Sequence, residues 1–214
     1  RVHARYPGFS IMHTEGCIDD LGKDAPDGVG DPVRFKESGW FQNDSFWWNA
    51  TCTDWAYTQP WVGDRVADHP VYTPVHRYAR DIIVSLDHWV TGWIDWNIVL
   101  DERGGPNHVG NFCGAPIMID TRSGEVYFTP VFNVLAQLSR TIRPGDVAVQ
   151  TRTILDGLAD DTLHACATLS RERILSVQLL NTSKEALTVS LQIEEEFAEF
   201  RVPANAVQTV RVQL

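Results

Sequence analysis

Near its start the sequence reads Gly8-Phe9-Ser10-Ile11-Met12-His13-Thr14-Glu15-Gly16-Cys17. The apolar residues of this stretch predict a short buried strand that ends on a polar residue and a glycine. A second buried strand is predicted over residues 93–98, where Asp95 and Asn97 lie among apolar neighbours. Both predicted strands therefore carry polar side chains near their C-terminal ends.

A helix is predicted between these two strands. Thr73 is a suitable N-cap, and Pro74 suits the first helical position. Gly92 is expected to end the run that follows. In that run, apolar side chains recur at helical spacing at Val75, Tyr78, Ala79, Ile82, Ile83, Leu86 and Trp89.

A loop, a hairpin and a second helix are predicted next. Residues 101–107 form the loop, and residues 116–120 and 125–128 flank a turn at residues 122–124. Thr129 and Pro130 repeat the cap pattern of the first helix. The second helix is expected to stop before Pro144. Its apolar stripe consists of Val131, Val134, Leu135 and Leu138.

The rest of the chain has a different character. Short runs rich in β-forming residues are separated by turn signals every 8–12 residues, and several runs alternate apolar and polar side chains. This spacing predicts an antiparallel β-sandwich. We therefore divide the chain near Pro144, into residues 1–145 and 146–214. The predicted strands are residues 147–153, 163–169, 174–180, 186–193, 197–202 and 207–214.

Composition limits the possible functions. The formal net charge of −10 over 214 residues leaves no surplus of positive charge for a nucleic-acid backbone or an acidic membrane surface. No apolar run is long enough to predict a transmembrane helix. The four cysteines lack the paired spacing of a zinc site, and the aspartates between residues 19 and 31 do not follow the calcium-loop pattern, so no metal site is expected.

Three triplets match the acceptor pattern for N-glycosylation, beginning at Asn43, Asn49 and Asn181. The pattern is short and occurs often by chance. It therefore predicts nothing firm about modification.

The two predicted strand ends carry the candidate catalytic residues. In a β/α barrel the active site lies at the C-terminal ends of the strands, and a Glu placed there suits covalent chemistry on a sugar. Glu15 and Asp95 occupy such positions. The alternative for Glu15 is a solvated or ion-paired side chain without a catalytic role, because carboxylates are common at strand ends.

Several motifs resemble glycoside hydrolase family 30, the family of glucosylceramidase. Thr14-Glu15-Gly16-Cys17 resembles the Ser-Glu-Ala-Cys nucleophile motif, and residues 92–97 match Gly-Trp-Thr-Asp-Trp-Asn. Residues 104–112 match Gly-Gly-Pro-Asn-Trp-Val-Arg-Asn-Phe, and residues 116–120 match Pro-Ile-Ile-Val-Asp. The resemblance implies an α/β plus all-β fold, in which the last two β/α units of a (β/α)8 TIM barrel precede an antiparallel β-sandwich.

The resemblance also implies roles for residues. Glu15 is expected to be the nucleophile of a retaining β-glucosidase, and Trp96 is expected to form an apolar platform for the sugar. Asp95 and Asn111 are expected to hold sugar hydroxyls or neighbouring side chains. Alternatives stay open, because Trp96 can be core, Asp95 an internal anchor and Asn111 a turn cap. His13 shares a strand face with Glu15, so it can tune Glu15, bind substrate or be a core histidine.

Two features depart from the family. The acid/base Glu of the family lies in an Asn-Glu-Pro motif, but this chain contains no Asn-Glu pair. Two strands cannot close a barrel, so an upstream barrel half, on the same protein or on a separate chain, is the expected partner. An aromatic-rich segment at about residues 19–70 is much longer than the family's connection and is expected to be an insertion.

The expected substrate is a β-glucoside, either a glycolipid or a β-glucan, and no cofactor is implied. An endo-β-1,6-glucanase of the same family and a non-catalytic carbohydrate-binding remnant are the alternatives. The family favours a secreted, periplasmic or lysosome-like location, although the chain shows no targeting signal.

Overall fold

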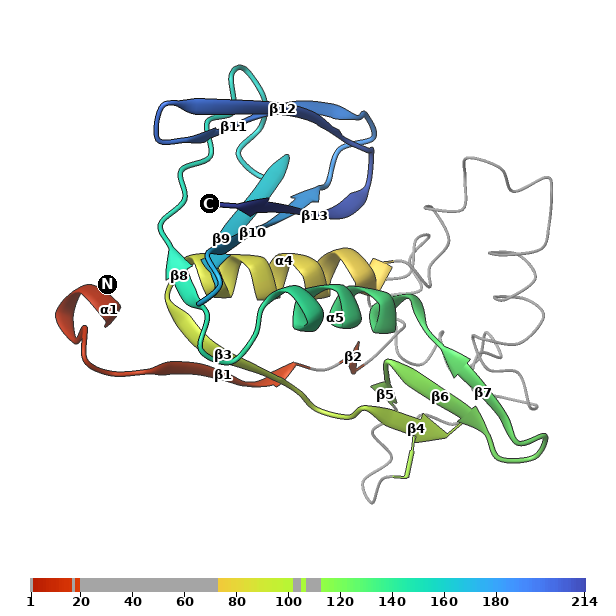
Figure 1. Ribbon diagram of the computed structural model, residues 1–214. Coiled ribbons are helices and arrows are strands. Elements are labelled where there is room, and N and C mark those ends of the chain that lie inside the picture. The colour runs from red at the N-terminus through yellow and green to blue at the C-terminus, as the bar shows by residue number, and fades with distance from the viewer. Residues whose placement is uncertain (1, 17, 20–72, 102–104, 107–112) are drawn as a thin grey trace. The chain divides into compact units, whose positions relative to one another are not determined.

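The computed structural model describes residues 2–16, 18–19, 73–101, 105–106 and 113–214 (Figure 1). The chain divides into two compact units. The first unit contains residues 1–13, 79–93 and 137–214, and the second contains residues 14–78 and 94–136. The aromatic-rich segment at 19–70 lies almost entirely outside the described residues, and the division of the chain at residue 145 stays a prediction.

The N-terminal part contains a short helix α1 (Val2–Arg5) and strands β1 (Ile11–Gly16), β2 (Ile18–Asp19) and β3 (Val90–Asp95). β1 pairs with β3. The Thr91 hydroxyl donates to the Ile11 carbonyl at 3.1 Å, and the Trp96 N–H donates to the Gly16 carbonyl at 2.6 Å. Both strands therefore advance in the same direction, as neighbouring strands of a β/α barrel do.

Helix α4 (Thr73–Asp87) begins at the predicted cap residue but ends before the predicted stop at Gly92. The chain turns where Trp89 adopts a left-handed φ of 69°. The His88 N–H reaches the Val84 carbonyl, and the Trp89 N–H reaches the Leu86 carbonyl. The helical spacing of Trp89 was therefore misleading, because this residue belongs to the turn that closes the helix.

Gly92 lies within β3 rather than at the end of the helix. A Cβ atom at this position would lie 3.1 Å from the Cε atom of Met12 on β1. A side chain at this position would need the flexible end of Met12 to shift slightly, and the glycine does not act as a helix stop.

The second unit contains a sheet of β4 (Val99–Asp101), β6 (Ile117–Asp120) and β7 (Glu125–Phe128). β4 and β6 are parallel, and β6 and β7 form the predicted antiparallel hairpin. β5 (Cys113–Gly114) pairs with β2. The buried residues Leu100, Ala115 and Met118 form part of the apolar interior here.

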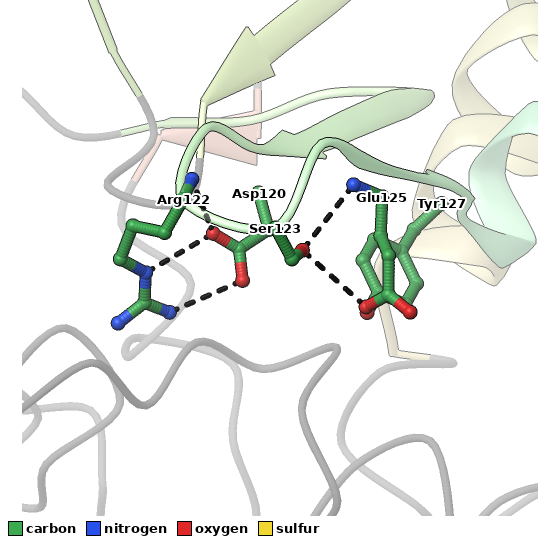
Figure 2. Close-up of polar contacts among 5 residues, drawn as sticks. All are labelled: Asp120, Arg122, Ser123, Glu125 and Tyr127. Carbon is green, nitrogen blue, oxygen red and sulfur yellow. Dashed lines mark hydrogen bonds and ion pairs between the residues drawn. The ribbon is translucent and has the colours of Figure 1, made fainter.

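Polar side chains stabilise the tip of the β6–β7 hairpin (Figure 2). The Arg122 guanidinium donates to both oxygens of Asp120, at 3.0 and 3.2 Å, and this hydrogen bonding holds the pKa of Asp120 below its ordinary value. The Tyr127 hydroxyl donates to the Glu125 carboxylate, and this bond raises the pKa of Tyr127 to about 12. Ser123 donates to the same carboxylate at 3.5 Å.

Helix α5 (Pro130–Thr141) begins and ends as predicted. The Thr129 side chain donates to the Ala115 carbonyl at 3.2 Å, and the Phe132 N–H donates to the Thr129 carbonyl at 3.0 Å. The stripe residues Val131, Val134 and Leu138 are buried. The sequence pattern therefore located both the start and the buried face of this helix.

The C-terminal strands form a four-stranded sheet and a separate hairpin (Figure 1). In the sheet the order is β13-β10-β9-β8, and every pair is antiparallel. The core lies between sheet and hairpin, where Leu175, Val177 and Leu179 pack with side chains of the hairpin. The strands are β8 (Val147–Val149), β9 (Leu163–Leu169), β10 (Ile174–Asn181), β11 (Leu187–Ile193), β12 (Glu196–Val202) and β13 (Ala206–Gln213).

A chain of polar contacts joins the sheet to the end of α5. The fully buried Gln178 donates to the Thr141 hydroxyl at 2.9 Å and accepts from the Thr209 hydroxyl at 2.5 Å. Gln137 of the helix donates to Thr209 at 2.9 Å. Because both the amide nitrogen and the amide oxygen of Gln178 have partners, its burial carries no unpaired polar group.

Asn181 is fully buried, so in the folded chain the triplet that begins there is not accessible as a glycosylation site. Its amide nitrogen donates to the carbonyls of Glu185 and Pro203, both at 2.8 Å. Its side-chain oxygen accepts from the N–H and the hydroxyl of Ser183. The side chain therefore closes the turn that follows β10. The other two triplets lie outside the described residues.

Replacing Asn181 with Ala is expected to lower the free energy of unfolding by about 3 kcal/mol, because the buried amide makes several hydrogen bonds to backbone groups that the alanine cannot replace. Urea unfolding of the full-length protein measures this change. Gln192→Ala is the control, since Gln192 lies on exposed β11 surface, and its effect should stay within about 0.5 kcal/mol. Equal stability of the Asn181 variant and the wild type would contradict the structural role.

Candidate active site

The candidate site is built on the C-terminal ends of β1 and β3. Glu15 is the last residue but one of β1, and its side chain is exposed. Asp95 is the last residue of β3, and Trp96 follows it. The bond from the Trp96 N–H to the Gly16 carbonyl joins the two strand ends directly. The structure thus brings the backbones at Glu15 and Trp96 to the same edge of a pair of strands that run in one direction.

Trp96 has 57% of its surface exposed, so it is not a core residue within this chain. Its backbone is nevertheless held firmly, because its N–H also lies 3.0 Å from Oδ1 of Asp95. An exposed indole on a fixed backbone suits an apolar platform, since a sugar presents apolar C–H faces that an aromatic ring can cover.

Asp95 is engaged by neighbouring groups of the protein. Its Oδ1 atom accepts from the Tyr78 hydroxyl at 2.9 Å as well as from the Trp96 N–H. Its Oδ2 atom is buried, and no group in the described part of the chain donates to it. Burial raises the pKa of Asp95, although the bonds from Tyr78 and Trp96 act in the opposite direction. This arrangement agrees with the anchor interpretation of Asp95.

His13 belongs to the first unit, where Asp81 and Trp93 are its neighbours. Its Nε2 atom lies 3.5 Å from Oδ2 of Asp81, and its ring stacks on Trp93 with centroids 5.4 Å apart. Trp93 donates from its indole nitrogen to the same Asp81 oxygen at 2.8 Å. Direct substrate contact by His13 stays a prediction.

Asn111, the remaining predicted site residue, lies outside the described residues. The loop that leads towards it is closed at its base by Asp101. The Gly105 N–H donates to the Asp101 side chain at 2.8 Å, and the Asp101 N–H donates to the Gly105 carbonyl at 2.7 Å. Across the described ranges, no group of three His, Cys, Asp or Glu side chains gathers as a metal site would require.

Two residues that contact the predicted site residues, Tyr78 and Asp81, are not indicated by any motif. Both lie on α4, where Tyr78 was interpreted only as a member of the apolar stripe. The stripe does carry a partial signal for Tyr78, because a buried tyrosine hydroxyl requires a hydrogen-bond partner, but it does not identify Asp95 as that partner. For Asp81 the sequence carried no signal, since a charged residue on the polar face of a helix is ordinary.

Known proteins similar to this chain support the predicted fold. SrfJ from Salmonella typhimurium superimposes with a TM-score of 0.67 at 18% identity, over 100% of this chain and 37% of that protein. An endo-β-1,6-glucanase superimposes with a TM-score of 0.66 at 16% identity, over 98% of this chain and 37% of that protein. None of the described helices has the length and apolarity of a membrane span.

Relatives in sequence carry glucosylceramidase names. Putative glucosylceramidase 4 of Caenorhabditis elegans is 32% identical over 141 residues, which are 64% of this chain and 26% of that protein. Lysosomal acid glucosylceramidase of Mus musculus is 32% identical over 134 residues, which are 62% of this chain and 25% of that protein. The chain therefore spans about a quarter of the length of these relatives.

Two family models match consecutive parts of the chain. The TIM-barrel domain of glycosyl hydrolase family 30 matches residues 58–142, and the β-sandwich domain of the same family matches residues 147–210. Glu15 lies ahead of the first match, so its role depends on the local motif and the strand geometry. The two matches together cover well over half of the sequence and confirm the predicted fold class, a portion of the TIM barrel followed by a β-sandwich. The chain belongs to glycoside hydrolase family 30.

Proposed function

We propose that this chain supplies the nucleophile and part of the sugar platform of a retaining β-glucosidase. The observation that carries the proposal is the exposed Glu15 at the end of β1, whose next residue is bonded to the backbone of Trp96 at the end of β3. A retaining glycosidase needs a carboxylate nucleophile at the anomeric carbon of its sugar. An aromatic ring on the neighbouring strand end can cover an apolar face of that sugar.

In the first step, a carboxylate oxygen of Glu15 attacks the anomeric carbon, and the bond from that carbon to the leaving oxygen breaks. A carboxylic acid protonates the leaving oxygen. In the second step, water attacks the anomeric carbon, the ester bond to Glu15 breaks, and the carboxylate that gave up its proton accepts one from the water. We place that acid/base group outside these 214 residues, because the sequence has no Asn-Glu pair.

The proposed substrate is a β-glucoside. The sequence relatives named glucosylceramidase favour glucosylceramide as the first compound to test. A soluble aryl β-glucoside tests the chemistry without the lipid. A β-1,6-linked glucan tests the alternative specificity, and its hydrolysis without cleavage of glucosylceramide would change the substrate assignment while leaving the mechanism in place.

Labelling of the full-length protein tests the nucleophile. A 2-deoxy-2-fluoroglucosyl fluoride in the β-configuration is expected to add one glycosyl group, since the fluorine at C2 slows release of the glycosyl-enzyme. Intact mass and peptide mapping should locate the group on Glu15, and Glu15→Gln should remain unlabelled. The control Glu199→Gln, which alters an exposed carboxylate on β12, should label as the wild type does. A label on another residue, or turnover without any label on Glu15, would refute the assignment.

A second prediction concerns Trp96. Trp96→Ala is expected to lower kcat/KM for an aryl β-glucoside by about tenfold to a hundredfold, because losing the contact of a large aromatic side chain costs about 1.5–3 kcal/mol. Trp96→Phe should retain more activity. The control is Trp89→Ala, which removes an exposed indole stacked on His3 and should change kcat/KM by less than about twofold. Equal activity of the two alanine variants would argue against a platform at Trp96.

A further inference from the structure

Tyr78 is a buried polar residue that the proposed mechanism does not use. It lies on α4 with 6% of its surface exposed. A buried tyrosine hydroxyl is costly unless it is hydrogen-bonded, and here it donates to Oδ1 of Asp95 at 2.9 Å. Tyr78 therefore joins the helix to the end of β3 through a specific polar bond.

Asp95 also forms a hydrogen bond with the backbone. Its Oδ1 atom accepts from both the Tyr78 hydroxyl and the Trp96 N–H, while Oδ2 is buried. Oδ1 is thus already engaged by two donors of the protein, and Oδ2 is shielded from solvent. The carboxyl group therefore accepts hydrogen bonds from Tyr78 and Trp96.

The Trp96 N–H is shared between Asp95 and the strand beside it. It lies 3.0 Å from Oδ1 of Asp95 and 2.6 Å from the carbonyl of Gly16, the residue after Glu15. A continuous series of hydrogen bonds therefore leads from Tyr78 through Asp95 and Trp96 to Gly16. This series ends next to the proposed nucleophile.

We propose that Tyr78 and Asp95 form a positioning pair that fixes the backbone of Trp96 against Gly16 and so sets the placement of the sugar platform relative to Glu15. The inference rests on the proposed roles of Glu15 and Trp96. A misplacement of about 1 Å in a reacting geometry can cost about a hundredfold in rate, so a pair that holds both strand ends has a direct effect on turnover.

Tyr78→Phe in the full-length protein tests the pair, because it removes the hydroxyl and keeps the ring in its apolar surroundings. We expect kcat/KM for an aryl β-glucoside to fall by about tenfold to a hundredfold. The affinity for the iminosugar 1-deoxynojirimycin, measured by calorimetry, should fall by about tenfold. The matched control is Tyr127→Phe, since the hydroxyl of Tyr127 also donates to a carboxylate, that of Glu125 (Figure 2). It should leave both quantities within about twofold of the wild type.

A double-mutant comparison separates positioning from simple stabilisation. If Tyr78 acts through Trp96, then adding Tyr78→Phe to Trp96→Ala should change kcat/KM and iminosugar affinity by less than about twofold. The same loss in both backgrounds would mean that Tyr78 does not act through Trp96, and this result would overturn the inference. The inference would also be overturned if Tyr78→Phe alone had the same kcat/KM and iminosugar affinity as the wild type.

Asp95 provides a second pair of variants if Tyr78→Phe does not fold. Asp95→Asn keeps a carbonyl oxygen that can accept from Tyr78 and Trp96, whereas Asp95→Ala removes the acceptor. Asp95→Asn is expected to retain much more activity and iminosugar affinity than Asp95→Ala. Equal values for the two variants would overturn the positioning role.

The outcome for the wild type separates this inference from the proposed function. A wild-type protein that is labelled on Glu15 and turns over substrate, yet tolerates Tyr78→Phe, would contradict only the positioning pair. Sugar binding without turnover would contradict catalysis, and the pair would then be judged by the binding measurements. A wild-type protein that neither turns over the glucoside nor binds the iminosugar would overturn both.

Discussion

The site depends on the hydrogen bond from the Trp96 N–H to the Gly16 carbonyl. It is formed where β1 and β3 end, and it can form only if the two strands advance together in the register that the Thr91 and Ile11 contact also requires. The bond brings the backbone beside Glu15 to the backbone of an exposed aromatic residue. In another register, Glu15 and Trp96 would not lie at the same edge of the strand pair.

The sequence was sufficient to predict most of the fold, because each element carries a local signal. Thr129 and Pro130 located the start of α5, and alternation located β11 and β13 within about one residue. The prediction for Gly92 was wrong because a glycine inside a strand has the same appearance in a sequence as one that stops a helix. Asn181 was likewise ambiguous, since its burial follows from a tertiary turn.

The candidate site was predictable only in part. The motifs indicated Glu15, Asp95 and Trp96, and the family comparisons support a glycosidase. The motifs did not indicate that Asp95 bonds to Tyr78, because the two residues are 17 positions apart and meet only after α4 packs. Contacts of this kind depend on how a helix is rotated about its axis, and a hydrophobic stripe fixes that rotation too coarsely to identify a single hydroxyl.

The most direct test of the account is a crystal structure of the full-length protein after reaction with the fluoroglucosyl inactivator. We predict continuous density between the anomeric carbon and a carboxylate oxygen of Glu15, with the sugar ring against the Trp96 indole and the Trp96 N–H still bonded to Gly16. A sugar attached to another residue, or a Glu15 carboxylate directed away from Trp96, would contradict the assignment of these strand ends as the active site.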